Sequence, residues 1–102
     1  MIRRGEVWAY RPALERPGQS LARLIVSASG INDDEGLPTV VGLKVLDSDP
    51  GGLLAVRVDP HGWASALTIE PVLRPRLTER LGEAPGESME QVERALTAML
   101  DL

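Results

Sequence analysis

TVVGLKVLDSDPGGLLAVRVD, residues 39–59, contains two runs in which apolar residues recur at every second position. The first run, Thr39–Leu46, places three apolar side chains on one face: Val41, Leu43 and Val45. The second run, Leu53–Asp59, does the same with Leu54, Val56 and Val58. A period of two is typical of a β-strand with one buried face. The turn formers between the runs, Asp47–Gly52, predict a hairpin connection.

Further short runs rich in Val, Leu and Ile lie on both sides of this stretch, separated by Gly and Pro. They predict three more strands: Glu6–Arg11, Arg23–Ala28 and Ala64–Leu73. Pro12–Ser20 and Gly30–Pro38 are expected to be loops. The second loop holds the acidic run Asp33–Glu35, which we interpret as a solvated turn, because adjacent carboxylates repel one another when buried. No further ligand at suitable spacing indicates a metal site there.

The C-terminal segment changes to a helical period. Counted from Met89, apolar residues recur on one helical face at Val92, Leu96, Met99 and Leu100. Ser88 stands at the expected N-cap, with Gln91 three residues later, so the two can form a capping box. The sequence therefore predicts a helix over 89–100 and an α+β fold that is mainly β.

Composition limits the classes of protein to consider. The chain has 102 residues, which fits one domain over 1–102, and its 43% hydrophobic content suffices for one core. It has no cysteine, no apolar run of signal-peptide length and no stretch that could span a membrane, which favours a cytoplasmic location. The net charge of −4 and the three aromatic residues count against strong non-specific RNA binding.

Three segments together resemble a known family. The chain opens with Ile2-Arg3-Arg4-Gly5-Glu6-Val7-Trp8, continues with the strand-like Ala22–Ser27 followed by Asn32, and closes with Leu73–Glu83 ahead of the helix. In type and spacing these segments resemble the MazF/PemK toxins of bacterial toxin–antitoxin pairs. The likeness covers nearly the whole chain and lies mostly on structural residues, so it bears more on fold than on activity.

The resemblance implies a small SH3-like antiparallel barrel with helices packed on it, usually dimeric. It also implies a sequence-specific endoribonuclease that cuts single-stranded RNA without a metal or other cofactor and is neutralised by an antitoxin protein. A CcdB-like toxin that acts by binding another protein, without cleavage, is the alternative.

The resemblance also implies which residues act. Arg23 is the nearest match to the family's catalytic Arg, and its planar fork suits a phosphate. The family's Thr or Ser at the end of the third strand falls near Val45, so Ser48 is the candidate hydroxyl, although a Ser in a DSDP turn more often bonds its own backbone. Lys44, Arg11 and Trp8 are the candidate RNA-binding residues, with Lys44 supplying positive charge and Trp8, beside Tyr10, able to stack on a base.

Two other groups of polar residues are expected to have no part in the site. His61 is the only histidine, but it stands in Asp59-Pro60-His61-Gly62, a turn sequence in which a lone histidine is usually a bystander. Arg57 and Asp59 point to one strand face, and some family members use an Arg and an Asp on one strand. We interpret this pair as an exposed ion pair of small energetic value.

Overall fold

A computed structural model describes residues 1–102 as seven strands and two helices. The strands are β1 (Glu6–Tyr10), β2 (Ala22–Ile25), β3 (Thr39–Leu46), β4 (Ala55–Arg57), β5 (Trp63–Ser65), β6 (Glu70–Leu73) and β7 (Leu77–Glu83). The helices are α1 (Ser29–Asn32) and α2 (Gly86–Leu100), and two 3₁₀ turns are η1 (Ala66–Thr68) and η2 (Arg74–Arg76).

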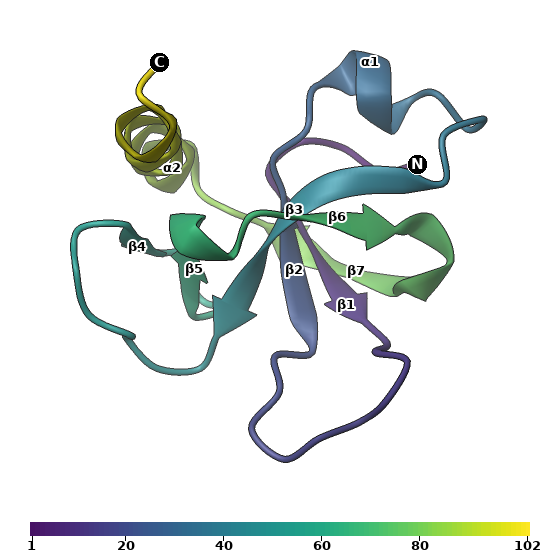
Figure 1. The fold of residues 1–102 in the computed structure, drawn as a ribbon, viewed down its shortest axis with the longest axis horizontal. Coiled ribbons are helices and arrows are strands. Elements are labelled where there is room, and N and C mark those ends of the chain that lie inside the picture. Colours follow the sequence, from purple (N-terminus) through teal and green to yellow (C-terminus); the bar gives the residue numbers. More distant parts are fainter.

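All strands belong to one antiparallel sheet with the order β4-β5-β3-β2-β1-β7. Strand β3 runs through its centre: β2 pairs with one edge, while β6 and β5 pair with successive halves of the other edge. Strands β4 and β7 end the path and do not pair with each other, so the sheet is not closed. The predicted mainly β fold with a C-terminal helix is confirmed, with a bent, open sheet in place of a closed barrel (Figure 1).

The hairpin predicted at Asp47–Gly52 is wrong, because β5 lies between β3 and β4. The tight turn after β4 is the cause: Val58 donates its N–H to the carbonyl of Gly62 at 2.8 Å, which folds β5 back onto β4. Gly62 has φ +125°, and a Cβ there would lie 2.2 Å from the carbonyl oxygen of Leu46. This close approach seats β5 against β3, and 47–54 becomes a longer connection to the sheet edge.

Other predicted strands differ from expectation in their bounds: Arg23–Ala28 is observed as Ala22–Ile25, and Glu6–Arg11 ends at Tyr10. The strand predicted over Ala64–Leu73 is broken by η1, so its two ends pair with different halves of β3. The strand predicted over Leu53–Asp59 is regular only at Ala55–Arg57, although its alternation holds: Val56 and Val58 are buried and Arg57 is exposed. Residues 77–83, part of the closing segment that resembles the toxin family, form β7 against β1.

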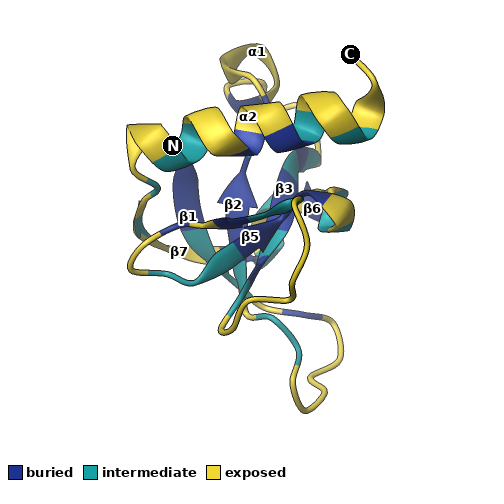
Figure 2. Ribbon diagram, turned by 90° about the vertical axis from the view of Figure 1, so that its left-hand side faces the viewer, coloured by how far each residue is buried: buried dark blue, intermediate teal, exposed yellow.

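Helix α2 covers one face of the sheet, and the main core lies between them (Figure 2). That core includes Val7, Leu24 and Leu43 from the strands and Val92 and Ala95 from the helix. A second, smaller cluster lies on the opposite face: Ile25, Val40, Val72 and Leu77, with Trp8 and Tyr10 packed against it. Three of the candidate residues, Trp8, Arg23 and Lys44, lie on this second face.

The predicted helix is present, but its start is different. It begins at Gly86, with Pro85 at the N-cap and no side-chain cap, so the capping box at Ser88 is wrong. The Ser88 hydroxyl instead donates to the carbonyl of Arg57 at 2.9 Å and ties the first turn of the helix to β4. Val92 is buried, as the helical period predicts, whereas Leu96 is only half-buried and Leu100 at the end is exposed. No helix of the chain has the length and apolar character needed to cross a membrane.

Candidate functional site

A row of side chains crosses the sheet on the face away from α2. Strand register sets Trp8 of β1 opposite Arg23 of β2, and Arg23 opposite Lys44 of β3. Directly paired residues of antiparallel strands point to the same side of the sheet. Ile25, two residues after Arg23, lies in the second cluster with Trp8, which identifies the face. The structure therefore brings together three of the residues that the sequence singled out.

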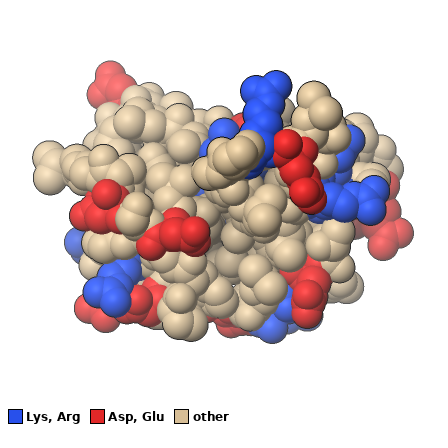
Figure 3. All heavy atoms as spheres, turned by 90° about the horizontal axis from the view of Figure 1, so that it is seen from below, with Lys and Arg blue, Asp and Glu red and all other residues tan.

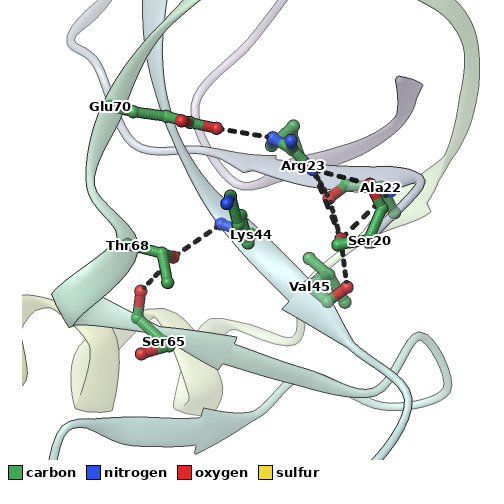
Figure 4. A network of polar contacts seen from close by, with 8 residues as sticks. All are labelled: Ser20, Ala22, Arg23, Lys44, Val45, Ser65, Thr68 and Glu70. Atoms are coloured by element: carbon green, nitrogen blue, oxygen red, sulfur yellow. Dashed lines mark hydrogen bonds and ion pairs between the residues drawn. The ribbon is translucent and has the colours of Figure 1, made fainter. Parts of the chain in front are cut away.

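Arg23 is the buried centre of this row. It is 2% exposed, so it is not the surface arginine that a strand start suggests. Its Nε donates to Oε1 of Glu70 at 2.9 Å, and its Nη1 donates to the carbonyls of Ser20 (3.2 Å) and Ala22 (2.9 Å). The guanidinium carbon lies 4.0 Å from the centroid of the Tyr10 ring, a cation–π contact. These contacts hold the guanidinium in one orientation (Figure 4).

Glu70 reaches Arg23 from the other edge of β3. It pairs with Gly42 in the register of β6 and β3, and Gly42 is two residues before Lys44 and on the same face of β3. A Cβ on Gly42 would lie 3.1 Å from Cγ2 of Val72 and 3.6 Å from Cβ of Arg23. The absence of a side chain at this position leaves room for the ion pair to form across β3.

Each member of the ion pair keeps one polar atom uncommitted. The Glu70 side chain is 34% exposed, and its Oε2 has no hydrogen-bond partner. The Nη2 of Arg23 also makes no hydrogen bond, although the Arg23 side chain is only 3% exposed. The ion pair therefore leaves one donor and one acceptor without a hydrogen-bond partner.

Thr68 supplies a hydroxyl next to Lys44 that the sequence did not identify. Its Oγ1 accepts the backbone N–H of Lys44 at 2.8 Å and donates to the carbonyl of Ser65 at 2.7 Å. Figure 4 shows it on the turn that leads into β6, on the same side of β3 as Glu70. No local pattern marks Thr68, because its place depends on the pairing of β6 and β5 with β3.

Ser48 lies outside this group. It is exposed in the connection after β3, four residues beyond Lys44. That separation corresponds to ~13 Å along an extended chain. It makes no hydrogen bond, not even the one to its own backbone that the turn sequence suggested. The structure does not bring Ser48 to Arg23.

Arg11 borders the row at the end of β1, one residue after Tyr10, and its side chain is exposed. Its N–H donates to the carbonyl of Arg76 at 2.8 Å, and Nη1 of Arg76 donates to the carbonyl of Arg11 at 3.1 Å. The Arg76 guanidinium therefore lies against the backbone at the end of β1, one residue after Tyr10. Arg76 was not among the predicted site residues, because η2 meets the end of β1 only in the folded sheet.

Trp8 has a structural partner in the buried carboxylate of Glu6, which is 4% exposed. The indole Nε1 donates to Oε1 of Glu6 at 3.2 Å, Arg3 N–H donates to the same oxygen at 2.6 Å, and Arg80 Nε donates to Oε2 at 2.5 Å. Burial alone raises the pKa of Glu6, but the hydrogen bonds from Arg80, Trp8 and Arg3 outweigh it and lower the pKa below its usual value. The same pairing raises the pKa of Arg80.

The Arg57–Asp59 pair and His61 both lie outside the row. Arg57 Nε and Asp59 Oδ1 form a 2.6 Å ion pair whose side chains are 66% and 61% exposed, on the edge strand β4 and outside the row. His61 lies in the β4–β5 turn and packs on β7, where a Cβ on Gly82 would lie 2.8 Å from its Nε2. The acidic run at 33–35 is exposed, as predicted.

The charged surface is mixed. Figure 3 shows acidic and basic side chains interspersed around a largely uncharged face, without a continuous basic stripe. On this face positive charge for an anionic ligand comes from separate local groups, in agreement with the net charge of −4.

Comparisons with known proteins connect this geometry to solved structures. No protein-family model matches the chain, and no curated protein matches it. An endoribonuclease from a mycobacterial species, solved in complex with its cognate antitoxin, is 24% identical with a TM-score of 0.84, over 100% of this chain and 97% of that one. A second mycobacterial endoribonuclease is 25% identical with a TM-score of 0.80, over 99% and 92% of the two chains. MazF from Deinococcus radiodurans is 22% identical with a TM-score of 0.77, over 99% and 97%.

Proposed function

We propose that this chain, which has a MazF-like fold, is the toxin of a toxin–antitoxin pair and an endoribonuclease that cuts single-stranded RNA at a short sequence. The full-length likeness to endoribonucleases supports the reaction class. The observation that carries the proposal is the buried Arg23, which is fixed by Glu70 and two backbone carbonyls while its Nη2 makes no hydrogen bond, and which lies opposite Lys44 in the register of β2 and β3.

Arg23 carries a fixed positive charge, and RNA cleavage needs such a charge to stabilise its transition state. When the ribose 2′-oxygen attacks the adjacent phosphorus, negative charge accumulates on the phosphorane oxygens. A guanidinium fixed by Glu70, two backbone carbonyls and the Tyr10 ring is preorganised to stabilise that charge without moving. Lys44, its cross-strand partner, adds a second positive charge on the same face. None of these groups requires a metal ion, so the proposed reaction is metal-independent.

The flanking residues define a path for the RNA strand. Arg11 and Arg76 lie beyond Tyr10, and we propose that they bind phosphates next to the scissile one. Trp8 is half-buried and bound to Glu6, so its proposed role is to support a base at the edge of its ring. Ser48 remains a prediction from sequence, while the geometry favours Thr68 as the hydroxyl of the site.

The proposed partners are an antitoxin protein and a second copy of the chain. One solved relative binds its cognate antitoxin, and an acidic, partly disordered segment is suited to cover Arg11, Lys44 and Arg76. If a cognate antitoxin binds while RNA cleavage or growth arrest continues unchanged, the toxin assignment is wrong.

Loss of cleavage, with action by protein binding alone, is the second candidate function. The ion pair between Arg23 and Glu70 favours it, because the charge of the arginine is already partly neutralised within the protein. The net charge of −4 also favours protein binding over RNA binding.

Cleavage of a defined single-stranded RNA in the presence of EDTA separates these candidates. We expect the purified protein to cut the RNA at a small number of positions and to leave 2′,3′-cyclic phosphate ends. Cutting that disappears in EDTA would contradict the metal-independent reaction. Absence of cutting on RNAs that together contain every short sequence would leave protein binding as the function.

A further inference from the structure

The hydroxyl of Ser20 lies beside the guanidinium of Arg23, at the end of the β1–β2 loop. We propose that Ser20 is a positioning residue of the cleavage site: it fixes the rotation of the Arg23 guanidinium and so directs the nitrogen without a hydrogen bond, Nη2, toward the RNA. The proposal rests on the proposed endoribonuclease function and adds to it a residue that acts through Arg23 without touching the substrate.

The proton of the Ser20 hydroxyl is committed to a backbone carbonyl. Its Oγ donates to the carbonyl of Val45 at 2.6 Å, and the other carbonyl within reach, that of Ala22 at 3.0 Å, would use the same proton. A hydroxyl has one proton and two lone pairs, so the oxygen can then only accept. Nη1 of Arg23 lies 3.3 Å from Oγ, and the backbone nitrogen of Ala22 lies 3.4 Å from it. The hydroxyl therefore presents an acceptor to the guanidinium (Figure 4).

The Arg23 guanidinium is held at two of its three nitrogens. Nε donates to Oε1 of Glu70 at 2.9 Å. Nη1 donates to the carbonyl of Ser20 at 3.2 Å, to its Oγ at 3.3 Å and to the carbonyl of Ala22 at 2.9 Å. A planar group that is bonded at two nitrogens has one orientation, which also sets the direction of the third. Ser20 supplies two of the three acceptors at Nη1, so its loss frees the end of the guanidinium that Glu70 does not hold.

Ser20 also fixes the backbone from which its own carbonyl reaches the guanidinium. The paired register of β2 and β3 ends one residue after Ala22, and there the Ser20 hydroxyl lies between the N–H of Ala22 and the carbonyl of Val45. On the other side, the carbonyl of Leu21 accepts the N–H of Tyr10 at 2.8 Å, which ties the same segment to β1 without the serine side chain. Loss of the hydroxyl should therefore loosen the acceptors around Nη1 while β1 and β2 stay paired.

The test compares single-turnover cleavage of one RNA in EDTA with binding of the same RNA carrying a 2′-deoxy sugar at the cleavage position, which measures affinity without reaction. Ser20→Ala removes the hydroxyl. Ser20→Thr keeps it and adds a methyl group at a residue that lines an open hollow beside the end of β3. Ser88→Ala is the matched control, because the Ser88 hydroxyl also joins two elements by donating to a carbonyl, that of Arg57 at 2.9 Å, but lies on α2.

We expect Ser20→Ala to cut the RNA about 10–30-fold more slowly than wild type, because a small misplacement of a catalytic group costs up to about 10²-fold in rate. Its affinity for the 2′-deoxy RNA should stay within a few-fold of wild type, since Arg23 keeps its charge. Ser20→Thr should restore most of the rate. Ser88→Ala should cut like wild type, although urea denaturation should show a loss of stability similar to that of Ser20→Ala.

A double variant separates positioning from a general weakening of the fold. In Arg23→Lys there is no Nη1 for Ser20 to hold, so adding Ser20→Ala should lower the residual rate by less than about two-fold. A loss of equal size in both backgrounds would show that Ser20 only supports the fold, and it would overturn the proposal. A wild-type rate in Ser20→Ala would overturn it as well.

The orientation of the guanidinium can also be followed without RNA cleavage. Heteronuclear NMR reports how freely an arginine side chain rotates, and the spectrum of Arg23→Lys identifies the signals of Arg23. We expect restricted rotation in wild type and Ser20→Thr, and faster rotation in Ser20→Ala. If the wild type cuts RNA while Ser20→Ala changes neither the rate nor these signals, only the role of Ser20 is wrong. If the wild type cuts no RNA, the proposed function fails and the catalytic role of Ser20 fails with it.

Discussion

The guanidinium of Arg74 donates a 2.8 Å hydrogen bond to the backbone carbonyl of Asn32, at the carboxyl end of α1. Its other nitrogens bind the carbonyls of Ile31, Asp34 and Leu37 at 2.6–2.9 Å. The carboxyl end of a helix has unpaired carbonyls and partial negative charge, so a cation there is favourable. One side chain therefore holds the 31–37 corner against η2, which precedes β7.

Arg74→Ala should lower the free energy of unfolding by about 2–3 kcal/mol, because a charged donor to several carbonyls is lost from a half-buried site. Urea denaturation measures the change. Arg16→Ala is the control, since Arg16 is an exposed loop residue whose side chain makes no hydrogen bond, and it should stay within about 0.5 kcal/mol of wild type. Equal stability of the two variants would show that the corner is held by other contacts.

Glu6 should make stability depend on acid pH. Its folded pKa lies below the usual value of about 4.5, so its contribution is fully present above pH 4.5 and is lost as the pH falls through the lower folded value. We expect wild type to lose more stability than Glu6→Gln between about pH 5 and about pH 2. Urea denaturation at several pH values checks this, with Glu79→Gln following wild type. Parallel curves for wild type and Glu6→Gln would rule out the linkage.

The contact of α2 with the sheet should depend on Val92, which is 1% exposed in the main core. Val92→Ala removes two buried methyl groups and should cost about 1–3 kcal/mol. Leu100→Ala on the same helix removes a larger but exposed side chain and should cost less than about 0.5 kcal/mol. Thermal or urea unfolding distinguishes them, and a larger loss for Leu100→Ala would place the helix differently on the sheet.

Assembly is a separate expectation. A chain of 102 residues has a modest core, and a two-fold dimer would bury more apolar surface. Exposed leucines such as Leu53 and Leu67, at 97% and 69% exposure, are available for such burial. Light scattering at micromolar concentration should report about twice the mass of one chain. A monomer over the whole concentration range contradicts the expectation.

Elements with a strong local period were predictable from sequence, and the contacts between distant elements were not. Thr39–Leu46 alternates cleanly and forms a strand with those bounds, and the apolar face of α2 follows its 3.6-residue period. The strand order was missed because the tight turn at Gly62 overrides the turn formers of Asp47–Gly52.

In the site, too, single residues were predictable from sequence, while the contacts between them were not. Arg23, Lys44 and Trp8 were identified as separate residues, and register alone sets them in one row. The burial of Arg23 was not predictable, because it depends on a Glu that lies 47 residues away and on the small size of Gly42. Thr68 and Glu70 stood within a predicted continuous strand, and the break at η1 separates the Thr68 turn from the strand that carries Glu70.

The last prediction concerns the chemistry of Arg23 itself. A guanidinium aimed at the developing phosphorane charge acts in the transition state, so its loss should lower kcat more than RNA binding. Arg23→Ala should reduce the single-turnover rate by about 10²–10³-fold, or roughly 3–4 kcal/mol in the barrier. Arg23→Lys should recover little, because a point charge cannot bond Glu70 and phosphate at once through one planar edge.

Arg57→Ala is the matched control, because Arg57 is also a strand arginine in an ion pair, yet it is 66% exposed on the edge strand β4. Its cleavage rate should remain within a few-fold of wild type.

All variants are compared by cleavage of one RNA in EDTA. Binding of the same RNA with a 2′-deoxy sugar at the cleavage position measures affinity, and urea denaturation measures folding. If Arg23→Ala cuts as fast as wild type while Arg57→Ala does not, the site lies at the β4 edge and the row across β1, β2 and β3 is structural. If Arg23→Ala does not fold, the cleavage rate of Arg23→Lys, which keeps the charge, is the test instead. Wild-type rates in a stable Arg23→Lys would show that charge alone is needed there, and that the fork shared with Glu70 plays no part in the reaction.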